Sequence, residues 1–174
     1  MKKVFYFIGL IGFLSFSNVC FGNDNYLNLD NVVCADNSCE VGGSHFYDVD
    51  SLLNYSSNFL GVHYVYGGKT PKGFDCSGFL SYVFKKFNIA TPYRAMDYAH
   101  FGQKIEEEEV KPGDVVCFTG RNSYSSTIGH VGIVTKVENG KITFINAACS
   151  SGISYATTTN VYWGPRVLGY RRIF

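Results

Sequence analysis

The stretch GGKTPKGFDCSGFLSYVF, residues 67–84, sets one cysteine between a glycine-rich turn and an apolar helix. Its first half carries the Gly and Pro residues that are typical of turns. From Cys76 to Phe87 the apolar residues recur at helical spacing, and polar residues fall between them. The pattern therefore predicts a helix whose first residue is Cys76.

A cysteine at the start of a helix can serve as a nucleophile. A thiol attacks as the thiolate, and the free amides and dipole of a helix N-terminus favour that anion and lower the thiol pKa. The same amides can hydrogen-bond the oxyanion of a tetrahedral intermediate. A buried structural cysteine is the alternative, and position alone does not separate it from a catalytic Cys76.

Catalysis by a thiol also needs a base, and His130 is the best placed of the 4 histidines. It follows a glycine and opens a strand, where a rigid element can hold an imidazole beside a helix end. His45 and His100 lie in irregular segments that are typical of solvated side chains, while His63 adjoins the glycine turn and could line a site.

Asn146 is a polar residue in the second arm of a predicted β-hairpin that begins at His130. A two-residue turn, 139–140, would put the two side chains on opposite faces, because side chains alternate along a strand. A three-residue turn, 138–140, with a bulge at its glycine, sets Asn146 opposite Gly132 and on the same face as His130. We expect this second register, in which Asn146 can hydrogen-bond the imidazole and fix its tautomer.

The order of elements predicts the fold class. Asp48 can cap a helix that Gly61 ends, and the helix from Cys76 follows. After these come a short apolar strand over 114–119, the hairpin and further strands to the C-terminus. Helices first and antiparallel strands afterwards predict an α+β domain with helices packed on one side of a curved sheet.

The chain of 174 residues is long enough for one domain with a sizeable core. Residues 1–22 resemble a signal peptide, because two lysines precede an apolar run that is too short to span a membrane. Residues 23–45 are polar and without periodicity, and are interpreted as an irregular N-terminal extension. Residues 46–174 form the predicted folded domain.

A signal peptide implies export to the periplasm or the medium. Lipid attachment at Cys20 is a less favoured alternative, since Val19 is bulky for the position before such a cysteine. Removing Lys2 and Lys3 with the leader shifts the formal net charge from +1 to about −1. Nucleic acid and anionic membranes are therefore not the expected partners, because both need a basic face.

Without Cys20 the chain keeps five of its 6 cysteines, and an odd count in an exported protein implies an unpaired thiol. Cys34 and Cys39 could close a small disulfide loop, while Cys117 and Cys149 suit burial or pairing. Cys76 is then the unpaired one. The spacings do not match a zinc site, so no metal is expected.

Six pieces in order resemble the NlpC/P60 cysteine peptidases of bacterial cell walls, over about residues 62–153. They are HYVYGG (63–68), FDCSGF (74–79), TPYR (91–94), KPGDVVCF (111–118), GHVGIV (129–134) and FINA (144–147). The resemblance implies a papain-like α+β fold in which Cys76 is the nucleophile, His130 the general base and acid, and Asn146 the third polar residue. It also implies that Tyr64, Asp75, Ser77 and Arg94 help to bind the substrate.

The activity implied by the resemblance is hydrolysis of a peptidoglycan stem peptide between γ-D-glutamate and a diamino acid, through an acyl enzyme and without a cofactor. The chain departs from the family pattern in carrying Asn146 where His is more common and His63 where Pro is common. The segment GRNSYSSTIG, 120–129, is a longer insertion that we expect to form one wall of the cleft.

Two other functions remain open at this stage. The domain could bind the cell wall without chemistry, although the presence of all three candidate catalytic residues argues against that. The same thiol could also pass its acyl group to an amine, as an acyltransferase or transpeptidase, because the acceptor depends on cleft shape and access of water.

Overall fold

The computed structural model describes residues 48–174. The expectations for residues 1–22 and 23–45, for Cys20 and for the Cys34–Cys39 loop lie outside these residues. Helices within 48–174 are too short or too polar to cross a membrane.

The described part contains two α-helices, α1 (Val49–Ser57) and α2 (Cys76–Lys86), and three 3-10 helices, η2 (Ala95–Ala99), η3 (Glu107–Glu109) and η4 (Gly164–Arg166). Its strands are β1 (Lys69–Thr70), β2 (Gly73–Phe74), β3 (Gln103–Ile105), β4 (Val115–Thr119), β5 (Ile128–Glu138), β6 (Lys141–Ala148), β7 (Gly152–Thr157) and β8 (Val167–Arg172).

Helix α1 begins where the sequence predicts it, because the Asp48 side chain accepts a hydrogen bond from the Asp50 amide at 3.1 Å. It buries Leu52 and Ser56. The helix ends at Ser57, before the predicted stop at Gly61, and the intervening residues form turns.

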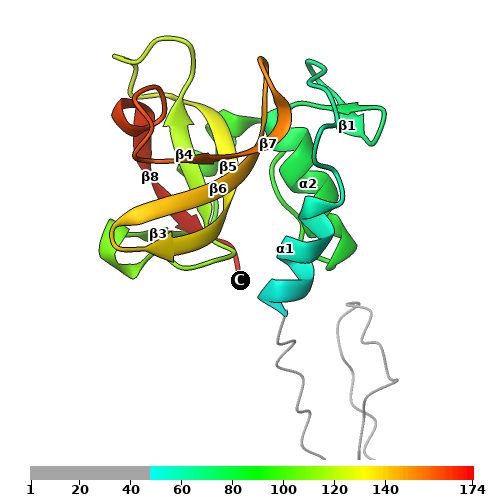
Figure 1. Cartoon of the computed structure of the whole chain (residues 1–174), viewed down its shortest axis with the longest axis horizontal. Coiled ribbons are helices and arrows are strands. Elements are labelled where there is room, and N and C mark those ends of the chain that lie inside the picture. Colours follow the sequence, from blue (N-terminus) through cyan, green and yellow to red (C-terminus); the bar gives the residue numbers. More distant parts are fainter. Residues whose placement is uncertain (1–47) are drawn as a thin grey trace, which may run out of the picture. The chain divides into compact units, whose positions relative to one another are not determined.

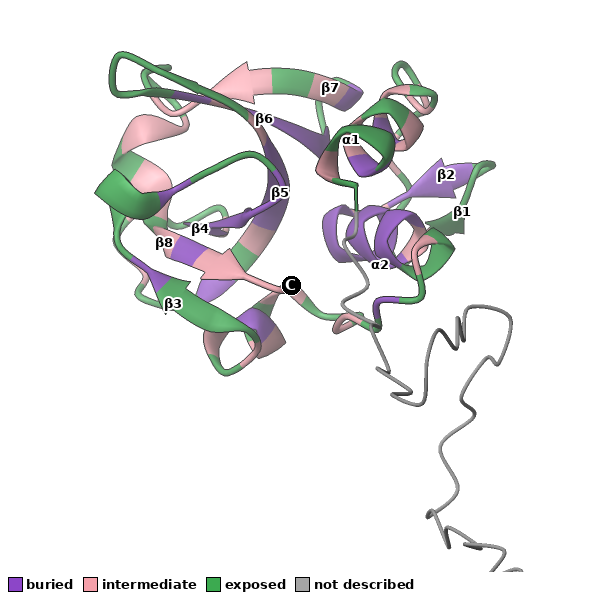
Figure 2. Ribbon diagram, turned by 90° about the horizontal axis from the view of Figure 1, so that it is seen from below, coloured by how far each residue is buried: buried purple, intermediate pink, exposed green. Residues whose placement is uncertain are grey.

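Helix α2 begins at Cys76, as predicted. Asp75 caps it, with Oδ1 accepting from the Gly78 amide at 2.6 Å and Oδ2 accepting from the Gly67 amide at 3.0 Å. One carboxylate thus joins the glycine turn to the first turn of the helix. A Cβ on Gly78 would lie 2.1 Å from the Gly68 carbonyl oxygen, so only glycine lets the turn approach this closely. Figure 2 shows α2 buried along most of its length, unlike α1.

The six-stranded sheet has the order β3-β8-β4-β5-β6-β7, and its neighbouring strands pair antiparallel. Helices α1 and α2 lie together on one side of it (Figure 1), which confirms the predicted α+β arrangement. One core cluster joins α2 to one face of the central strands, through Phe79, Val131 and Ile145. A second cluster covers the opposite face, around Phe118 and Phe144.

The β5–β6 turn differs from the expected one. Glu138 pairs with Lys141, so the turn has two residues, Asn139 and Gly140, with φ of 49° and 74°. Two consecutive positive φ angles are typical of a type I′ turn, which suits the right-handed twist of the flanking strands. The prediction of a three-residue turn was wrong.

A bulge in β5 compensates for the shorter turn. The register shifts between Val134 and Lys136, so that Thr135 is the extra residue in β5. On the side of the bulge that faces away from the turn, Ile133 pairs with Ile145, which is the register that the longer turn would have produced. A Cβ on Gly132 would lie 3.3 Å from the Asn146 Cβ, so these residues are neighbours as predicted, although for a different reason.

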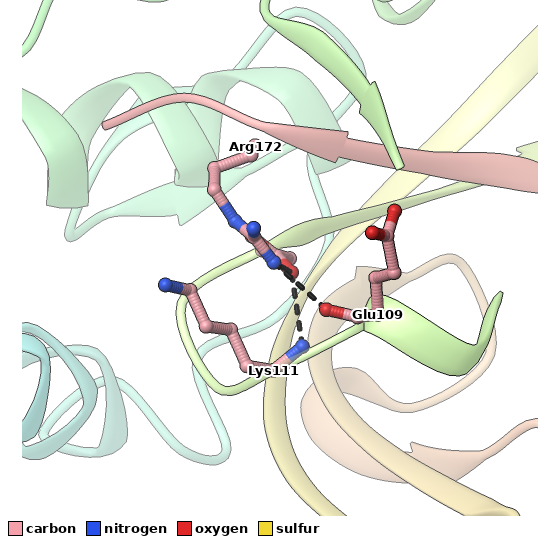
Figure 3. A network of polar contacts seen from close by, with 4 residues as sticks. Glu109, Lys111 and Arg172 are labelled. Carbon is pink, nitrogen blue, oxygen red and sulfur yellow. Dashed lines mark hydrogen bonds and ion pairs between the residues drawn. The ribbon is translucent and has the colours of Figure 1, made fainter. Parts of the chain in front are cut away.

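Asp114 holds three segments together at the start of β4. Its carboxylate accepts hydrogen bonds from Arg172 Nε and Nη2 at 2.9 and 2.8 Å and from the Lys111 amide at 2.9 Å. Arg172 Nη2 also donates to the Glu109 carbonyl at 2.9 Å. Figure 3 shows Glu109, Lys111 and Arg172 side by side in this network. The network ties the last residue of β8 to the turn before β4.

Candidate active site

A cavity of about 810 Å³ brings together residues from distant parts of the chain. Cys76 reaches it from the first turn of α2, His130 from β5 and Asn146 from β6. The backbone of Val131, the residue after His130, lowers the pKa of the Cys76 thiol, which places it close to the sulfur. The three residues proposed for catalysis therefore line one space.

His130 and Asn146 lie on the same face, which confirms the predicted proximity of their side chains. His130 Nε2 is 2.9 Å from Asn146 Oδ1, and Asn146 Nδ2 donates to the Ser154 carbonyl at 3.1 Å. Because the Ser154 carbonyl can only accept, it fixes the orientation of the amide and turns Oδ1 to the imidazole. Oδ1 also only accepts, so the neutral imidazole carries its proton on Nε2 and offers the lone pair of Nδ1 as a base.

Trp163 completes the surroundings of the imidazole. Its ring stacks on His130 with centroids 5.0 Å apart and an interplanar angle of 29°. The Phe118 ring lies 6.0 Å from the imidazole and 5.0 Å from the Trp163 ring, so the three rings pack together. Sequence reasoning missed this residue, because it lies just before η4 with no periodic pattern around it. The one available signal was that it is the only tryptophan of the chain.

Burial lowers the pKa of His130 to about 4. The Asn146 hydrogen bond and the charge of Asp75 act in the opposite direction, but burial is the largest effect. The neutral amide of Asn146 supplies no charge that would hold an imidazolium. His130 is therefore neutral at pH 7.

Burial also raises the pKa of the Cys76 thiol to about 11. The backbone amides of Val131, Ser77 and Cys76 itself lower it, while the Asp75 charge raises it further. The expectation of a lowered pKa was wrong, because the loss of hydration outweighs the stabilising amides. Thiol and imidazole are both neutral here, so His130 would have to take the thiol proton during the attack itself.

Tyr64 is the one predicted substrate-binding residue that the structure brings to the cavity. It is partly buried, and burial together with the neighbouring thiols of Cys149 and Cys76 raises its pKa. Cys149 lines the same cavity beside it. The phenol is thus a neutral hydrogen-bonding group close to the sulfur of Cys76.

The other three predicted binding residues are outside the described lining of the cavity. Asp75 caps α2, and Ser77 donates to the Tyr93 carbonyl at 2.9 Å. Arg94 is exposed and pairs with Asp97 at 2.8 Å. Each of these side chains already has an intramolecular partner, and their part in binding stays a prediction.

The remaining cysteines of the described part differ in exposure. Cys76, Cys117 and Cys149 are all free thiols. Cys117 is buried in β4, as expected, but Cys149 is exposed and lines the cavity. Its predicted strand ends one residue earlier, at Ala148, so Cys149 belongs to a turn.

Part of the insertion 120–129 borders the same cavity through Gly120, Arg121 and Gly129. Gly120 and Gly129 lie against each other, because a Cβ on Gly129 would be 2.6 Å from the Gly120 Cα. The two ends of the insertion therefore meet directly beside His130.

Comparison with known proteins gives a consistent result. The family model described as "NlpC/P60 family" matches residues 61–172. The chain is 38% identical over 123 residues to a γ-DL-glutamyl hydrolase of Bacillus subtilis, covering 70% of this chain and 28% of that protein. It is 32% identical over 135 residues to a probable endopeptidase of Haemophilus influenzae, covering 75% of this chain and 78% of that protein.

A solved structure from Staphylococcus aureus, described as similar to a lipoprotein of the NLP/P60 family, superimposes with a TM-score of 0.65 at 28% identity. The superposition covers 78% of this chain and 45% of that one. NlpC1 from Trichomonas vaginalis superimposes with a TM-score of 0.61 at 26% identity, covering 77% of this chain and 46% of that one.

Proposed function

The chain belongs to the NlpC/P60 family, and on that basis we propose that it is a cysteine endopeptidase that hydrolyses peptidoglycan stem peptides. The bond that we propose is the one between γ-D-glutamate and the following diamino acid, since the Bacillus subtilis relative is called a γ-DL-glutamyl hydrolase. The observation that carries the proposal is the shared cavity, in which the Cys76 thiol, a neutral His130 and its partner Asn146 meet.

The first half of the reaction forms an acyl enzyme. His130 Nδ1 accepts the thiol proton as the Cys76 sulfur attacks the carbonyl carbon of the scissile amide. The amides at the start of α2 that have no intrahelical partner stabilise the oxyanion. Asn146 keeps the proton on Nε2 throughout, so the imidazole always presents Nδ1 to the reacting atoms.

The second half releases the products. The proton on Nδ1 passes to the leaving nitrogen when the C–N bond breaks, and the new amine departs. His130 then takes a proton from a water molecule, whose oxygen attacks the thioester and frees the thiol and the carboxylic acid. Every proton that moves does so through one imidazole nitrogen, and no cofactor enters the scheme.

The decisive experiment is digestion of purified peptidoglycan with the protein and with a Cys76→Ala variant, followed by mass spectrometry of the products. We expect new amino groups on the diamino acid in the digest of the unaltered protein and none with the variant. A Cys117→Ala variant, which removes a buried thiol outside the cavity lining, is the matched control and should cleave normally.

The other candidate functions give different products in the same experiment. Peptidoglycan that both proteins bind but leave intact would identify a wall-binding domain. New cross-links that depend on Cys76 would identify a transferase. For hydrolysis of wall peptides the enzyme has to act outside the cytoplasm, and export through a leader at residues 1–22 belongs to this proposal.

A further inference from the structure

Arg121 carries the only full charge among the described residues that line the active-site cavity. Carboxylate side chains are missing from this part of the lining, and the other titratable groups there are thiols, phenols and a neutral imidazole. Guanidinium stays protonated at any physiological pH. The cavity is therefore positively charged on one side and has no counter-charge of its own.

Arg121 also has no hydrogen bond or ion pair with any other residue in 48–174. This sets it apart from Arg94, Arg166 and Arg172, each of which is held by a carboxylate or a carbonyl oxygen. Its five N–H donors are thus available to a ligand that enters the cavity.

The position of Arg121 assigns it to one side of the scissile bond. It follows Gly120, which lies against Gly129, and His130 is the next residue. Arg121 and His130 thus come from the β4–β5 part of the lining, while Cys76 comes from α2 and Tyr64 from the segment before the glycine turn. In the proposed reaction the acyl group stays on Cys76 and His130 protonates the leaving nitrogen, so the leaving fragment has to lie next to the β4–β5 part of the lining.

We propose that Arg121 binds the side-chain carboxylate of the diamino acid in the leaving fragment, and so selects diaminopimelate over lysine at that position. This inference rests on the proposed endopeptidase function and adds its substrate preference. Diaminopimelate and lysine both carry a side-chain amine, but only diaminopimelate has a carboxylate beside it. The carboxylate would pair with the guanidinium, whereas an isolated lysine ammonium would be repelled by it.

The test uses three peptides that differ in single groups. One has the form L-Ala-γ-D-Glu-diaminopimelate, the second carries lysine in its third position, and the third is the diaminopimelate peptide with its glutamate α-carboxylate amidated. We expect kcat/KM of the unaltered protein to be about tenfold or more higher for the first peptide than for the second, the effect of one charge-assisted pair.

The variant Arg121→Gln should bring this ratio close to one, mainly by raising KM for the diaminopimelate peptide, and Arg121→Lys should restore part of it. Lys141→Gln removes a positive charge from the remote end of the β5–β6 hairpin and should leave the ratio unchanged. A ratio that survives in Arg121→Gln would overturn the inference and leave the hydrolase intact. The inference would also be overturned if Arg121→Gln removed only the difference in kcat/KM between the first and third peptides. Arg121 would then bind the α-carboxylate of the glutamate and not the diamino acid.

Binding can be read separately from turnover. Trp163 is the only tryptophan of the chain and stacks on His130 in the cavity, so its fluorescence should change when a peptide binds to the inactive Cys76→Ala protein. In the Cys76→Ala background, we expect Arg121→Gln to weaken the binding of the diaminopimelate peptide about tenfold and to change the binding of the lysine peptide little. If no peptide binds or is cleaved, the proposed function falls and this inference with it.

Discussion

The Cys76 thiol keeps its proton, although it lies at the helix end that should favour the anion. Burial raises its pKa to about 11 and lowers that of His130 to about 4, so the pair is uncharged at neutral pH. A neutral pair avoids placing two charges in a poorly hydrated space. His130 then takes the thiol proton only when a substrate carbonyl is in place for the sulfur to attack.

Alkylation of the folded protein tests the protonation state. The rate of reaction of Cys76 with iodoacetamide should keep rising with pH towards about 11, because only the thiolate reacts. The site of labelling can be followed by mass spectrometry, with Cys76→Ala as the control for the other thiols. A rate that levels off below pH 8 would show that a thiolate already exists in the resting enzyme.

Asn146 sets the tautomer of the base, so its replacement should affect catalysis more than binding. Asn146→Ala leaves His130 Nε2 without the acceptor at 2.9 Å and allows the proton to move to Nδ1. We expect kcat to fall by about 10²-fold with little change in KM, since general-base assistance is lost in the transition state. Equal falls in affinity and rate would instead indicate a damaged cavity.

Asn146→Asp tests the electrostatic part of the same contact. A carboxylate beside His130 favours the imidazolium and raises its pKa from about 4. Since the base works only when unprotonated, the acid limb of the kcat/KM profile should move to higher pH. An acid limb that stays in place would mean that a group other than His130 controls it.

At the scale of elements, the network around Asp114 fixes the end of β8 to the start of β4. The Asp114 side chain is 3% exposed and the Arg172 side chain 23%. Asp114→Ala should lower the free energy of unfolding by about 2–4 kcal/mol, less than for a fully enclosed pair because Arg172 can turn towards water. Urea denaturation measures the change.

The matched control is the exposed pair Lys104–Glu106, whose side chains are 64% and 69% exposed. Glu106→Ala should change the unfolding free energy by less than about 1 kcal/mol. Similar losses from Asp114→Ala and Glu106→Ala would contradict the structural importance of the buried carboxylate.

Some elements could be predicted from the sequence because their causes are local. The cap at Asp48 and the apolar stripe after Cys76 were sufficient to place the starts of both α-helices, whereas the cap at Asp75 was found only in the structure. Strand β3 was missed because it is a short edge strand in which Gln103 and Lys104 are exposed, so no alternation marks it.

The hairpin gives a more instructive outcome. The shared face of His130 and Asn146 was predicted correctly, but from a longer turn than the one that forms. A sequence fixes how many residues separate two positions, and an extra residue can be placed either in the turn or in a bulge. The bulge at Thr135 depends on packing against neighbouring strands, which no local pattern records.

At the scale of the whole molecule, the site exists only because the α2 layer and the sheet pack together. The first core cluster joins Phe79 of α2 to Val131 and Ile145, the neighbours of His130 and Asn146 in their strands. Trp163 arrives from the far end of the chain and packs in the second cluster. The first cluster therefore holds the strands that carry His130 and Asn146, while the second packs Phe118 and Trp163 against the imidazole.

The partly buried His130 makes the fold sensitive to acid. His130 has a pKa of about 4 in the folded chain, compared with an ordinary value of 6.5. Between these two pH values the histidine is protonated in the unfolded chain but not in the folded chain. Stability is thus fully present above pH 6.5 and is lost as the pH falls towards 4, by about 1–3 kcal/mol.

Urea unfolding at pH 7 and pH 4.5 measures this loss. His130→Gln cannot take up the proton, so it should lose less stability between the two pH values than the unaltered protein does. Identical losses in the two proteins would assign the acid sensitivity to carboxylates elsewhere.

Strand β7 lies at the edge of the sheet, and its Ser154 carbonyl holds the amide that orients the base. Edge strands detach in local opening events that need much less free energy than global denaturation. Fraying of β7 would let the Asn146 amide rotate, so that it no longer fixes the tautomer of His130, while the rest of the domain stays folded. On heating, enzymatic activity should therefore disappear before the cooperative melting of the domain.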